Sequence, residues 1–448
     1  MALLRTSDET AKLDTSGSLV LRPEHLRLGM YVDLNCSWFK HPFPRRSFKL
    51  ISQSQITTIK GLGLATVLVY PRESDPETDE EGNVISPPPP STDVSETTAQ
   101  TSSDQVVAEP EDPQPSDEEL PTHGDYHQAV QLASTAYRQM LVQSSQMMKG
   151  LASGSDAGLR HAQSMIGGLR TLLTHTEAAG TVASAFNPED IGNASILHAL
   201  NVATLSMIVA QQFDIDQESL QLIGMAGMLL DVGEQRISRH ILQNRARRSE
   251  AEHVKYQLHP YLGVEMLRRF HGFPEEVLDI VRSHHERMDG SGYPEKLKGD
   301  QISFPTRIVS AVDHYDTLVN SFHPEDALSP AEALATMYKC QQQLFSPEVL
   351  IAMIQTLGVF PPGTVVTLTD GSFGQVLNIN FKYRLKPLVV LYDQAAPADQ
   401  PHTVDLQKES GLSILRAMPR DELPPHVIEY FRIKRWTGYF IQSSMRAA

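Results

Sequence analysis

The stretch HHERMDGSGYP, at residues 284–294, decides how the rest of the chain is interpreted. It begins with two adjacent histidines, and its two glycines, an aspartate and a proline predict a tight loop with Tyr293 at the tip. A loop beside a histidine pair is a natural wall for a ligand pocket. On periodicity alone, a plain turn between two helices is the alternative.

Other residues of metal-binding type lie outward from this loop, each inside or beside a helical pattern. With the pair they make six: His198, Asp231, His259, His284, His285 and Asp313. Imidazole and carboxylate bind first-row divalent metals, and a shared carboxylate can bridge two ions. Taken singly, each histidine is better explained as a surface or core residue, but the cluster favours a metal site. Adjacent histidines do not share a helix face, so both reach one centre only across a helix end or a seam between helices.

Residues 123–360 surround these candidates with apolar residues spaced three and four apart, such as Ile196, Leu200 and Ala203. This spacing predicts an all-helical domain. Residues 220–233, LQLIGMAGMLLDVG, are apolar on every side, which is typical of a buried central helix. We expect this helix to end near Asp231.

Different patterns flank the helical domain. Residues 1–72 contain alternating and buried apolar runs that predict a small β-rich module, with its aromatic residues, including Trp38, in the core of that module. Residues 361–448 return to a period of two, with a turn at Asp370, and predict a β-rich C-terminal module and tail. Residues 73–122 are rich in proline and acidic side chains and predict a disordered linker. The expected fold class is therefore multidomain, with a central all-α domain and a small β-rich module on each side.

Charge and composition restrict the class of protein. The 448-residue chain has a net charge of −16, but residues 73–120 hold fifteen acidic and no basic side chains, so the rest is nearly neutral. A basic groove for long nucleic acid is therefore not expected. No apolar run reaches the ~18 residues that span a bilayer. The start of the chain lacks a signal-peptide pattern, and the two cysteines, Cys36 and Cys340, lie in different modules, so we expect a reducing, cytoplasmic compartment.

The loop and its surroundings resemble a known family. HHERMDGSGYPEKLKGDQI at residues 284–302 and RIVSAVDHYDTL at 307–318 are similar to the HD-GYP branch of the HD phosphohydrolases. That family consists of bacterial metalloenzymes of signal transduction that hydrolyse cyclic di-GMP to pGpG or GMP. The N-terminal module similarly resembles a small domain of unknown function that is often fused to HD-GYP domains, and the C-terminal β-module resembles the trailing segment of such proteins.

The resemblance implies a role for each matching residue. Asp231 would bridge two ions, with His259, His284 and His285 around the first and His198 and Asp313 at the second. The implied cofactor is a divalent transition metal, iron or manganese, as one or two ions. The implied ligand is cyclic di-GMP or a related nucleotide, and protein partners would also bind through the loop. The loop residues concerned are Arg287, Asp289, Gly290, Gly292, Tyr293 and Pro294.

Several positions depart from the family pattern. Leu230 stands where the family has the histidine of the HD pair, and Glu234 replaces a lysine that approaches the scissile phosphate. Ala194 replaces a glutamate found in members with three metals, so a third ion is not expected. Phe322 and Glu325 stand where the family often has basic residues. A carboxylate ~4 Å from a phosphate is unfavourable by about 4 kcal/mol at an effective dielectric constant of ~20. These changes predict weak or no hydrolysis, with function through ligand or partner binding; an active phosphodiesterase is the alternative.

Besides repelling the phosphate, Glu234 has two other interpretations. It follows Asp231 by three residues, so on a continuing helix both carboxylates would face one side and Glu234 could replace the missing ligand in the catalytic site. Gly233 is a candidate helix end, which would separate them. The plain alternative is a carboxylate that is solvated or paired with arginine. Leu230 most simply extends the apolar face formed by Met228 and Leu229.

Overall fold

The structure is a computed structural model that describes most of the chain outside residues 76–139. The described residues are 12–13, 18–75, 140, 142–151, 153–175, 182–183, 194–244, 247–271, 273–323, 326–378, 383–394, 402–409, 411–431, 437 and 439–441. The expected disordered linker, residues 73–122, lies almost entirely outside them, and its disorder stays a prediction. No helix within the described ranges is long and apolar enough to cross a membrane.

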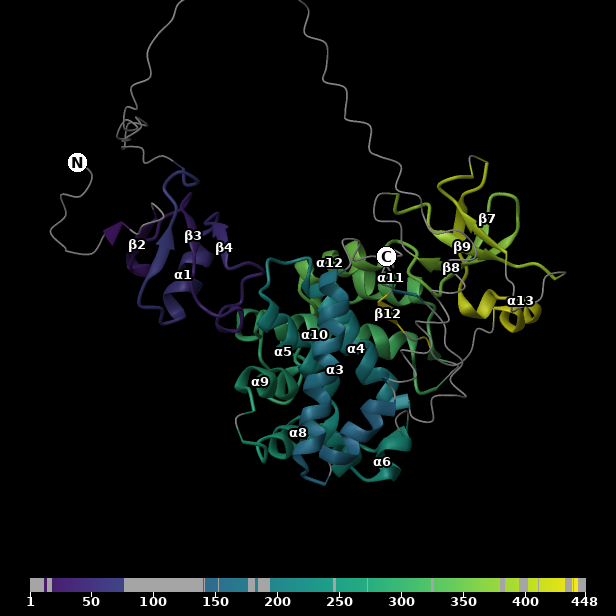
Figure 1. Cartoon of the computed structure of the whole chain (residues 1–448), viewed down its shortest axis with the longest axis horizontal. Coiled ribbons are helices and arrows are strands. Elements are labelled where there is room, and N and C mark those ends of the chain that lie inside the picture. The colour runs from purple at the N-terminus through teal and green to yellow at the C-terminus, as the bar shows by residue number, and fades with distance from the viewer. Residues whose placement is uncertain are drawn as a thin grey trace, which may run out of the picture. The chain divides into compact units, whose positions relative to one another are not determined.

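Contacts divide the chain into two units, which are described separately. The first unit comprises Met1–Asn35 and Ser47–Tyr126, and the second comprises Cys36–Arg46 and His127–Ala448. The first unit holds an antiparallel sheet of five short strands in the order β1-β2-β5-β3-β4. Its elements are β1 (Lys12–Leu13), β2 (Leu19–Leu21), β3 (Tyr31–Asp33), β4 (Ser47–Lys49), α1 (Gln53–Gly61) and β5 (Val67–Val69). This confirms the small β-rich N-terminal module (Figure 1).

The segment Cys36–Arg46 belongs to the second unit although it lies between β3 and β4 in sequence. Its Trp38 is buried in the core of the helical domain, with its ring centroid 5.3 Å from that of Phe304 and 6.3 Å from that of Phe213. Trp38 is thus a core residue, but of a different domain from the one expected. A module whose strands are only two or three residues long offers little interior to an indole ring.

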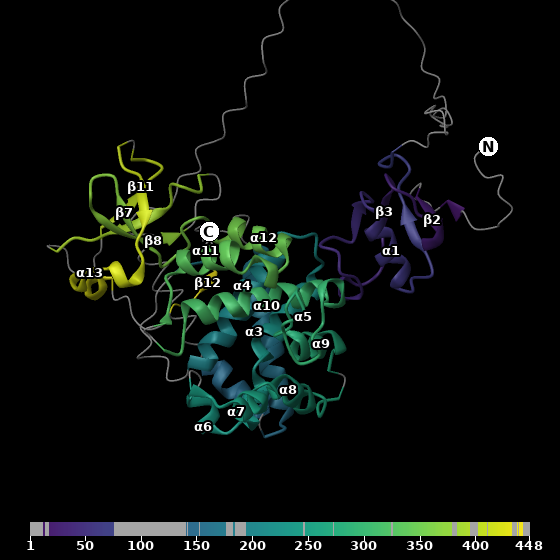
Figure 2. The same ribbon diagram turned by 180° about the vertical axis from the view of Figure 1, so that it is seen from behind.

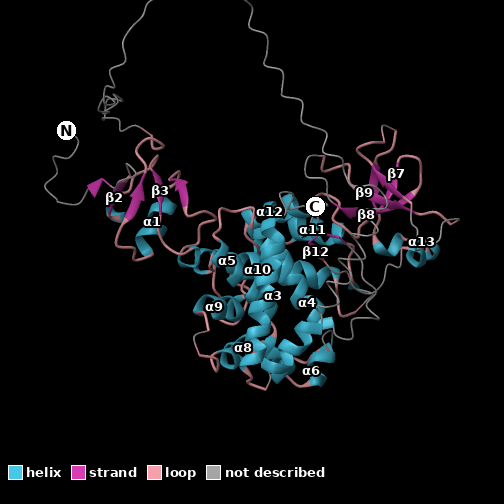
Figure 3. Ribbon diagram, viewed as in Figure 1, coloured by secondary structure: helices cyan, strands magenta, loops and turns pink. Residues whose placement is uncertain are grey.

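Helices make up the central domain, as the apolar spacing predicted (Figure 3). They are α3 (Asp156–His175), α4 (Ala194–Ala210), α5 (Gln217–Leu229), α6 (Arg239–Gln243), α7 (Glu250–Tyr256), α8 (His259–Leu267), α9 (Glu275–Ser283), α10 (Phe304–Val319), α11 (Pro330–Cys340) and α12 (Pro347–Leu357), with a 3-10 helix, η4 (Val232–Arg236), after α5. Helix α4 packs against α5 and α10, and all three contribute to one hydrophobic core. The buried central helix of the prediction is α5, which ends two residues before Asp231.

The C-terminal region forms a second antiparallel sheet of five strands, in the order β10-β9-β8-β7-β11 (Figure 2). The strands are β7 (Val365–Leu368), β8 (Phe373–Asn378), β9 (Leu388–Leu391), β10 (Thr403–Asp405) and β11 (Ile414–Ala417), followed by the short helix α13 (Pro425–Tyr430). The β7–β8 hairpin turns at Gly371, whose φ of 86° lies in the left-handed region. A last strand, β12 (Phe440–Ile441), pairs with β6 (Val182–Ala183). The predicted β-rich C-terminal module is confirmed.

Candidate metal centre

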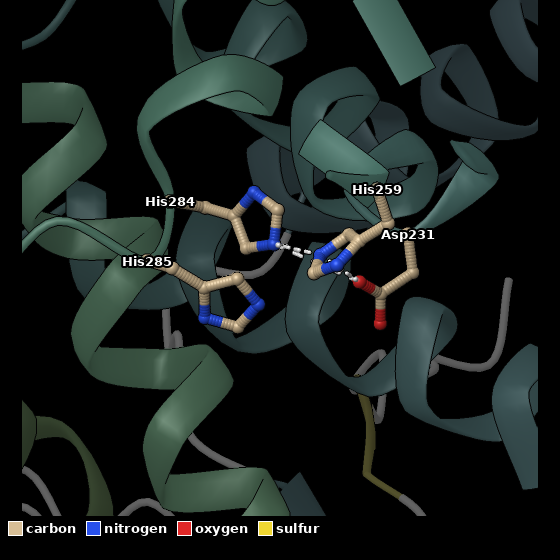
Figure 4. A group of neighbouring side chains, drawn as sticks. All are labelled: Asp231, His259, His284 and His285. Carbon is tan, nitrogen blue, oxygen red and sulfur yellow. Dashed lines mark hydrogen bonds and ion pairs between the residues drawn. The ribbon is translucent and has the colours of Figure 1, made fainter. Parts of the chain in front are cut away.

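Asp231 lies at the junction between α5 and η4, where the backbone leaves the α-helical conformation. Its two carboxylate oxygens face different histidines. Oδ1 is 3.3 Å from His259 Nε2 and 3.6 Å from His284 Nε2, whereas Oδ2 is 3.7 Å from His198 Nε2. Asp231 therefore lies between His198 on one side and His259 with His284 on the other, as a bridging carboxylate would. Figure 4 shows Asp231 with the second of these groups, which also includes His285.

Two backbone carbonyls fix the ring orientation of His259 and His284. Nδ1 of His259 lies 2.8 Å from the Tyr256 carbonyl oxygen, and Nδ1 of His284 lies 2.8 Å from that of Val281. A carbonyl only accepts, so each Nδ1 carries the proton, and in the neutral rings each Nε2 presents its lone pair. These two Nε2 atoms face each other at 3.3 Å. Two lone pairs so close repel unless a cation or a proton lies between them.

His285 joins the same group from the end of α9. The helix ends at Ser283, and His284 is its C-cap, so the two adjacent histidines lie at a helix end, where both can face one centre. The His285 ring stacks on the Tyr293 ring with centroids 4.6 Å apart. Among the residues that the structure describes, its buried Nε2 has no hydrogen-bond partner. The ligand atoms of Asp231, His259, His284 and His285 all lie within 4.8 Å of one another.

A second group forms around His198 on α4. Its Nε2 is 3.1 Å from Asp313 Oδ1, and its Nδ1 is 2.7 Å from Asp316 Oδ2, both on α10. The sequence analysis missed Asp316. The available signal was its position three residues after Asp313 on one helix, which places both carboxylates on the same face.

The pKa values in the site follow from burial and from these neighbours. Burial raises the pKa of the Asp231 carboxyl, but the neighbouring imidazoles of His259 and His284 outweigh burial and hold the pKa well below its usual range. Burial lowers the pKa of His198, but its hydrogen bonds to Asp313 and Asp316 on α10 outweigh burial and raise that pKa well above its usual value. Asp231 is therefore ionised at neutral pH, and a metal that binds His198 must displace a proton.

The other two groups of the site shift towards their neutral forms. Burial, together with the charges of His284 and His259, lowers the pKa of His285 well below its usual value. Burial, with the negative charges of Asp313 and Asp231, raises the pKa of Tyr293 well above its usual value. His285 is thus a neutral ligand without competition from a proton, and Tyr293 keeps its hydroxyl hydrogen.

These groups fit a divalent transition metal. Three imidazoles and one carboxylate form the nitrogen and oxygen donor set that such ions take, and the unpartnered His285 Nε2 would gain a partner. His259, His284, His285 and Asp231 would hold one ion. His198, Asp313 and the second oxygen of Asp231 offer a smaller donor set for another.

Leu230 and Glu234 differ in their surroundings. Leu230 is fully buried in the hydrophobic core, as an extension of the apolar face of α5. Glu234 is buried too, and its charge helps to raise the pKa of His259. Since η4 is a 3-10 helix with three residues per turn, Asp231 and Glu234 lie one above the other. The α-helix ends at Leu229, before Gly233, so Asp231 and Glu234 do not lie on one continuing α-helix. Among the described residues, the ligand atoms that converge belong to Asp231, His259, His284 and His285, and Glu234 is not one of them.

Two side chains of the loop after the histidine pair, Arg287 and Glu286, hold the loop by hydrogen bonds to its backbone. Arg287 donates from Nη1 to the carbonyl oxygens of His284 and Glu286 and to Ser310 Oγ. The buried Glu286 carboxylate accepts the N–H groups of Glu295 at 2.6 Å and Leu297 at 2.9 Å. Arg287 thus braces the loop, and Tyr293 is held against His285.

The remaining loop residues shape its turns. Asp289 is exposed and accepts the Ser291 N–H at 2.9 Å, and Gly290 has a φ of 84°. A Cβ at Gly292 would come within 2.5 Å of three atoms, Arg287 N, Glu286 Cα and His285 O, so only glycine fits. Pro294 follows a cis peptide bond. Of the other departures, Ala194 is the first residue of α4, Phe322 contacts the His323 ring, and Glu325 lies outside the described residues.

Gly233 controls the distance between Asp231 and His259. A Cβ at Gly233 would lie 2.0 Å from the His259 carbonyl oxygen and 2.5 Å from Gly263 N. We expect Gly233→Ala to push η4 away from α8, with a loss of about 1–3 kcal/mol in stability and weaker metal binding. Thermal unfolding with and without Mn²⁺ measures both. Gly168→Ala is the matched control, because no atom of the described residues lies within 4 Å of the Cβ that alanine would add there. Equal effects of the two changes would contradict the prediction.

Two models of known protein families match the chain. Residues 155–349, which hold all six candidate ligands, match the family model described as HD domain. The helical region is an HD domain. Residues 20–162 match a second model, a domain of unknown function (DUF3391), as the N-terminal resemblance implied.

Curated proteins similar to the chain are cyclic dinucleotide phosphodiesterases. A cyclic di-GMP phosphodiesterase of Pseudomonas aeruginosa (PA4108) is 26% identical over 374 residues, covering 83% of this chain and 84% of that protein. The response regulator RpfG of Xanthomonas campestris, also a cyclic di-GMP phosphodiesterase, is 31% identical over 40% of this chain and 47% of its own length. The 3'3'-cGAMP-specific phosphodiesterase 3 of Vibrio cholerae is 30% identical over 41% of this chain and 39% of its own. The HD domain is thus distantly homologous to HD-GYP cyclic di-GMP phosphodiesterases.

Proposed function

We propose that this chain is a metal-dependent phosphodiesterase that hydrolyses cyclic di-GMP or a related 3'3'-linked cyclic dinucleotide. The observation that carries the proposal is the pre-assembled group of Asp231, His259, His284 and His285, with converging ligand atoms. The homology of the HD domain to cyclic di-GMP phosphodiesterases supports it. The weak hydrolysis expected from Leu230 and Glu234 has less support, because the similar curated proteins are phosphodiesterases and the histidine and aspartate cluster is present.

The cofactor we propose is iron or manganese, as two divalent ions that share Asp231. Bound ions supply Lewis acidity toward a phosphodiester and make a water molecule acidic enough to attack phosphorus. His259 and His284 are oriented for this by the Tyr256 and Val281 carbonyls, which fix their tautomers. No rearrangement of either ring is needed on binding.

The loop residues would position the nucleotide. Because the pKa of Tyr293 is raised, its hydroxyl stays protonated and can donate a hydrogen bond to a phosphate oxygen. The stacking of Tyr293 on His285 keeps that hydroxyl beside the candidate metal ligands. Arg287 is occupied by carbonyl and hydroxyl groups of its own domain, so its role is to hold the loop, together with Gly290, Gly292 and Pro294.

One observation favours a second function, binding of a nucleotide or a protein partner without turnover. Glu234 reverses the charge of the lysine that the HD-GYP pattern has at this position, and a buried carboxylate near the phosphate would oppose its approach. In that case the loop at residues 284–294 would serve recognition alone.

A time course of hydrolysis tests the proposal. Purified protein is loaded anaerobically with Fe²⁺ or Mn²⁺ and incubated with cyclic di-GMP and, separately, with 3'3'-cGAMP, with Asp231→Ala as the blank. We expect linear or mononucleotide products from at least one substrate, well above the blank. Absence of product from folded, metal-loaded protein would overturn the proposal, and nucleotide binding under the same conditions would then establish the second function.

A further inference from the structure

A short segment after α13, residues 437 and 439–441, is built into the helical domain. Tyr439, just before β12, has no exposed surface, and its hydroxyl lies 3.1 Å from the hydroxyl of Tyr315 on α10. Strand β12 itself pairs with β6, and both α3 and α4 contact it. Residues 437 and 439–441, called the C-terminal strap below, are therefore docked against the helices that carry His198 and Asp313.

Two buried carboxamides hold the backbone of the strap. Asn201 on α4 donates from Nδ2 to the Thr437 carbonyl oxygen at 2.8 Å and accepts the Tyr439 N–H at 3.0 Å. Asn320, which follows α10, donates to the same carbonyl oxygen at 2.8 Å and accepts the Thr437 N–H. These contacts involve only main-chain groups of the strap. They therefore depend on the backbone conformation of the strap and not on the identity of its side chains.

The same two amides reach the metal centre through Asp316. Nδ2 of Asn201 and Nδ2 of Asn320 each lie 2.8 Å from Asp316 Oδ1, while Asp316 Oδ2 is 2.7 Å from His198 Nδ1. Each amide thus donates one hydrogen to Asp316 and the other to the strap. Asp316 is fully buried, and within the described ranges its two oxygens form hydrogen bonds with these amides and with His198.

We propose that the C-terminal strap positions His198 as a metal ligand, through Asn201 and Asn320 and then Asp316. A metal-binding histidine depends on the carboxylate that holds its other ring nitrogen, and loss of such a partner typically weakens metal binding about 10–100-fold. When the strap is displaced, each of the two amides loses its two hydrogen bonds to the strap, and both can turn away from Asp316. The His198 ring then loses the orientation in which Nε2 faces Asp231 and Asp313.

This inference rests on the proposed pair of metal ions, and it makes Asn201, Asn320 and Asp316 positioning residues. The polar atoms of Asp316 that the strap controls lie on the His198 side of the site. His259 and His284 are oriented by the Tyr256 and Val281 carbonyls and not by Asp316, so the strap should affect one ion and not the other.

Two substitutions at one position test the inference in the full chain. Thr437→Pro removes the N–H that Asn320 accepts, whereas Thr437→Ala keeps every main-chain group of the strap. Metal-free protein is titrated with Co²⁺ and followed by its visible absorption, and bound metal is counted after gel filtration. His198→Ala identifies the ion on the His198 side, and Asn201→Ala with Asn320→Ala breaks the same link from within the helical domain.

We expect wild-type protein and Thr437→Ala to bind two ions. Thr437→Pro and the double asparagine variant should bind the second ion 10–100-fold more weakly, with the stoichiometry of His198→Ala at limiting Co²⁺. Unchanged affinity for both ions in either folded variant would overturn the inference, as would a wild-type protein that binds a single ion. If two ions bind as expected and no substrate is hydrolysed, the proposed function fails and the positioning role of the strap stands.

Discussion

Replacing Asp231 with alanine should abolish hydrolysis of cyclic di-GMP and remove at least one bound metal ion. The two oxygens of Asp231 approach both histidine groups, at 3.3 Å from His259 and 3.7 Å from His198. Asp313 also approaches both groups, with Oδ1 3.1 Å from His198 and Oδ2 3.7 Å from His285, but only Asp231 is part of the cluster of converging ligand atoms found among the described residues. A carboxylate that bridges two ions cannot be replaced by a ligand of either group alone. We expect turnover to fall at least about a thousandfold, because both ions are needed to stabilise attacking and leaving oxygens.

Turnover and metal content, measured on the same samples, check this expectation. Asp214→Ala is the matched control, since Asp214 is an exposed aspartate of the same domain. The change also removes a buried negative charge that His259 and His284 hold ionised, so the variant should be folded before it is assayed, as circular dichroism can show. Activity within tenfold of wild type in a folded sample would exclude Asp231 as the bridging ligand.

Glu234→Gln should lower turnover about 10–100-fold, the effect expected when a group that supports a metal ligand is lost. Glu234 follows Asp231 by one turn of a 3-10 helix, is buried, and acts electrostatically on His259. If its carboxylate replaces the ligand missing at Leu230, the neutral amide binds metal more weakly. If instead it only repels the phosphate, the same change relieves repulsion and turnover rises. The two interpretations therefore differ in the sign of the effect.

Steady-state rates at saturating Mn²⁺, together with Mn²⁺ affinity, separate these outcomes. Glu275→Gln, at an exposed glutamate of the same domain, controls for the loss of one charge. A gain in turnover on Glu234→Gln would refute its role as a ligand. In that event Leu230→His combined with Glu234→Lys, which restores the HD-GYP pattern, should raise turnover further.

Much of the architecture could be predicted from local patterns. The three- and four-residue spacing defined the helical domain, and the period of two defined both β-rich modules, because burial of one face dictates those periods. The six candidate ligands were found because chemistry of that type rarely gathers around one tight loop. The structure brings Asp231, His259, His284 and His285 together at one place and His198 with Asp313 at the other.

Contacts between distant parts of the chain could not be predicted in this way. Asp316 and Asn201 bond to each other across 115 residues, and Asn201 bonds to Thr437 across 236. Such pairs leave no periodic trace in a single sequence. Glu234 illustrates the same limit at short range, since the switch from α-helix to 3-10 helix after Leu229 decides where its carboxylate lies.

The burial of Trp38 in the helical domain changes the expected effect of cleaving the chain within residues 76–122. The chain enters the helical domain at Cys36–Arg46, returns to the first unit, and only then runs through residues 76–122. An indole in a core is worth about 3–5 kcal/mol, and it is attached to the first unit on both sides. Proteolysis within residues 76–122 would therefore nick the backbone without releasing the N-terminal module, which stays tethered by its own buried tryptophan. The acidic segment is therefore not the only stretch of chain that connects residues of the first unit to residues of the second.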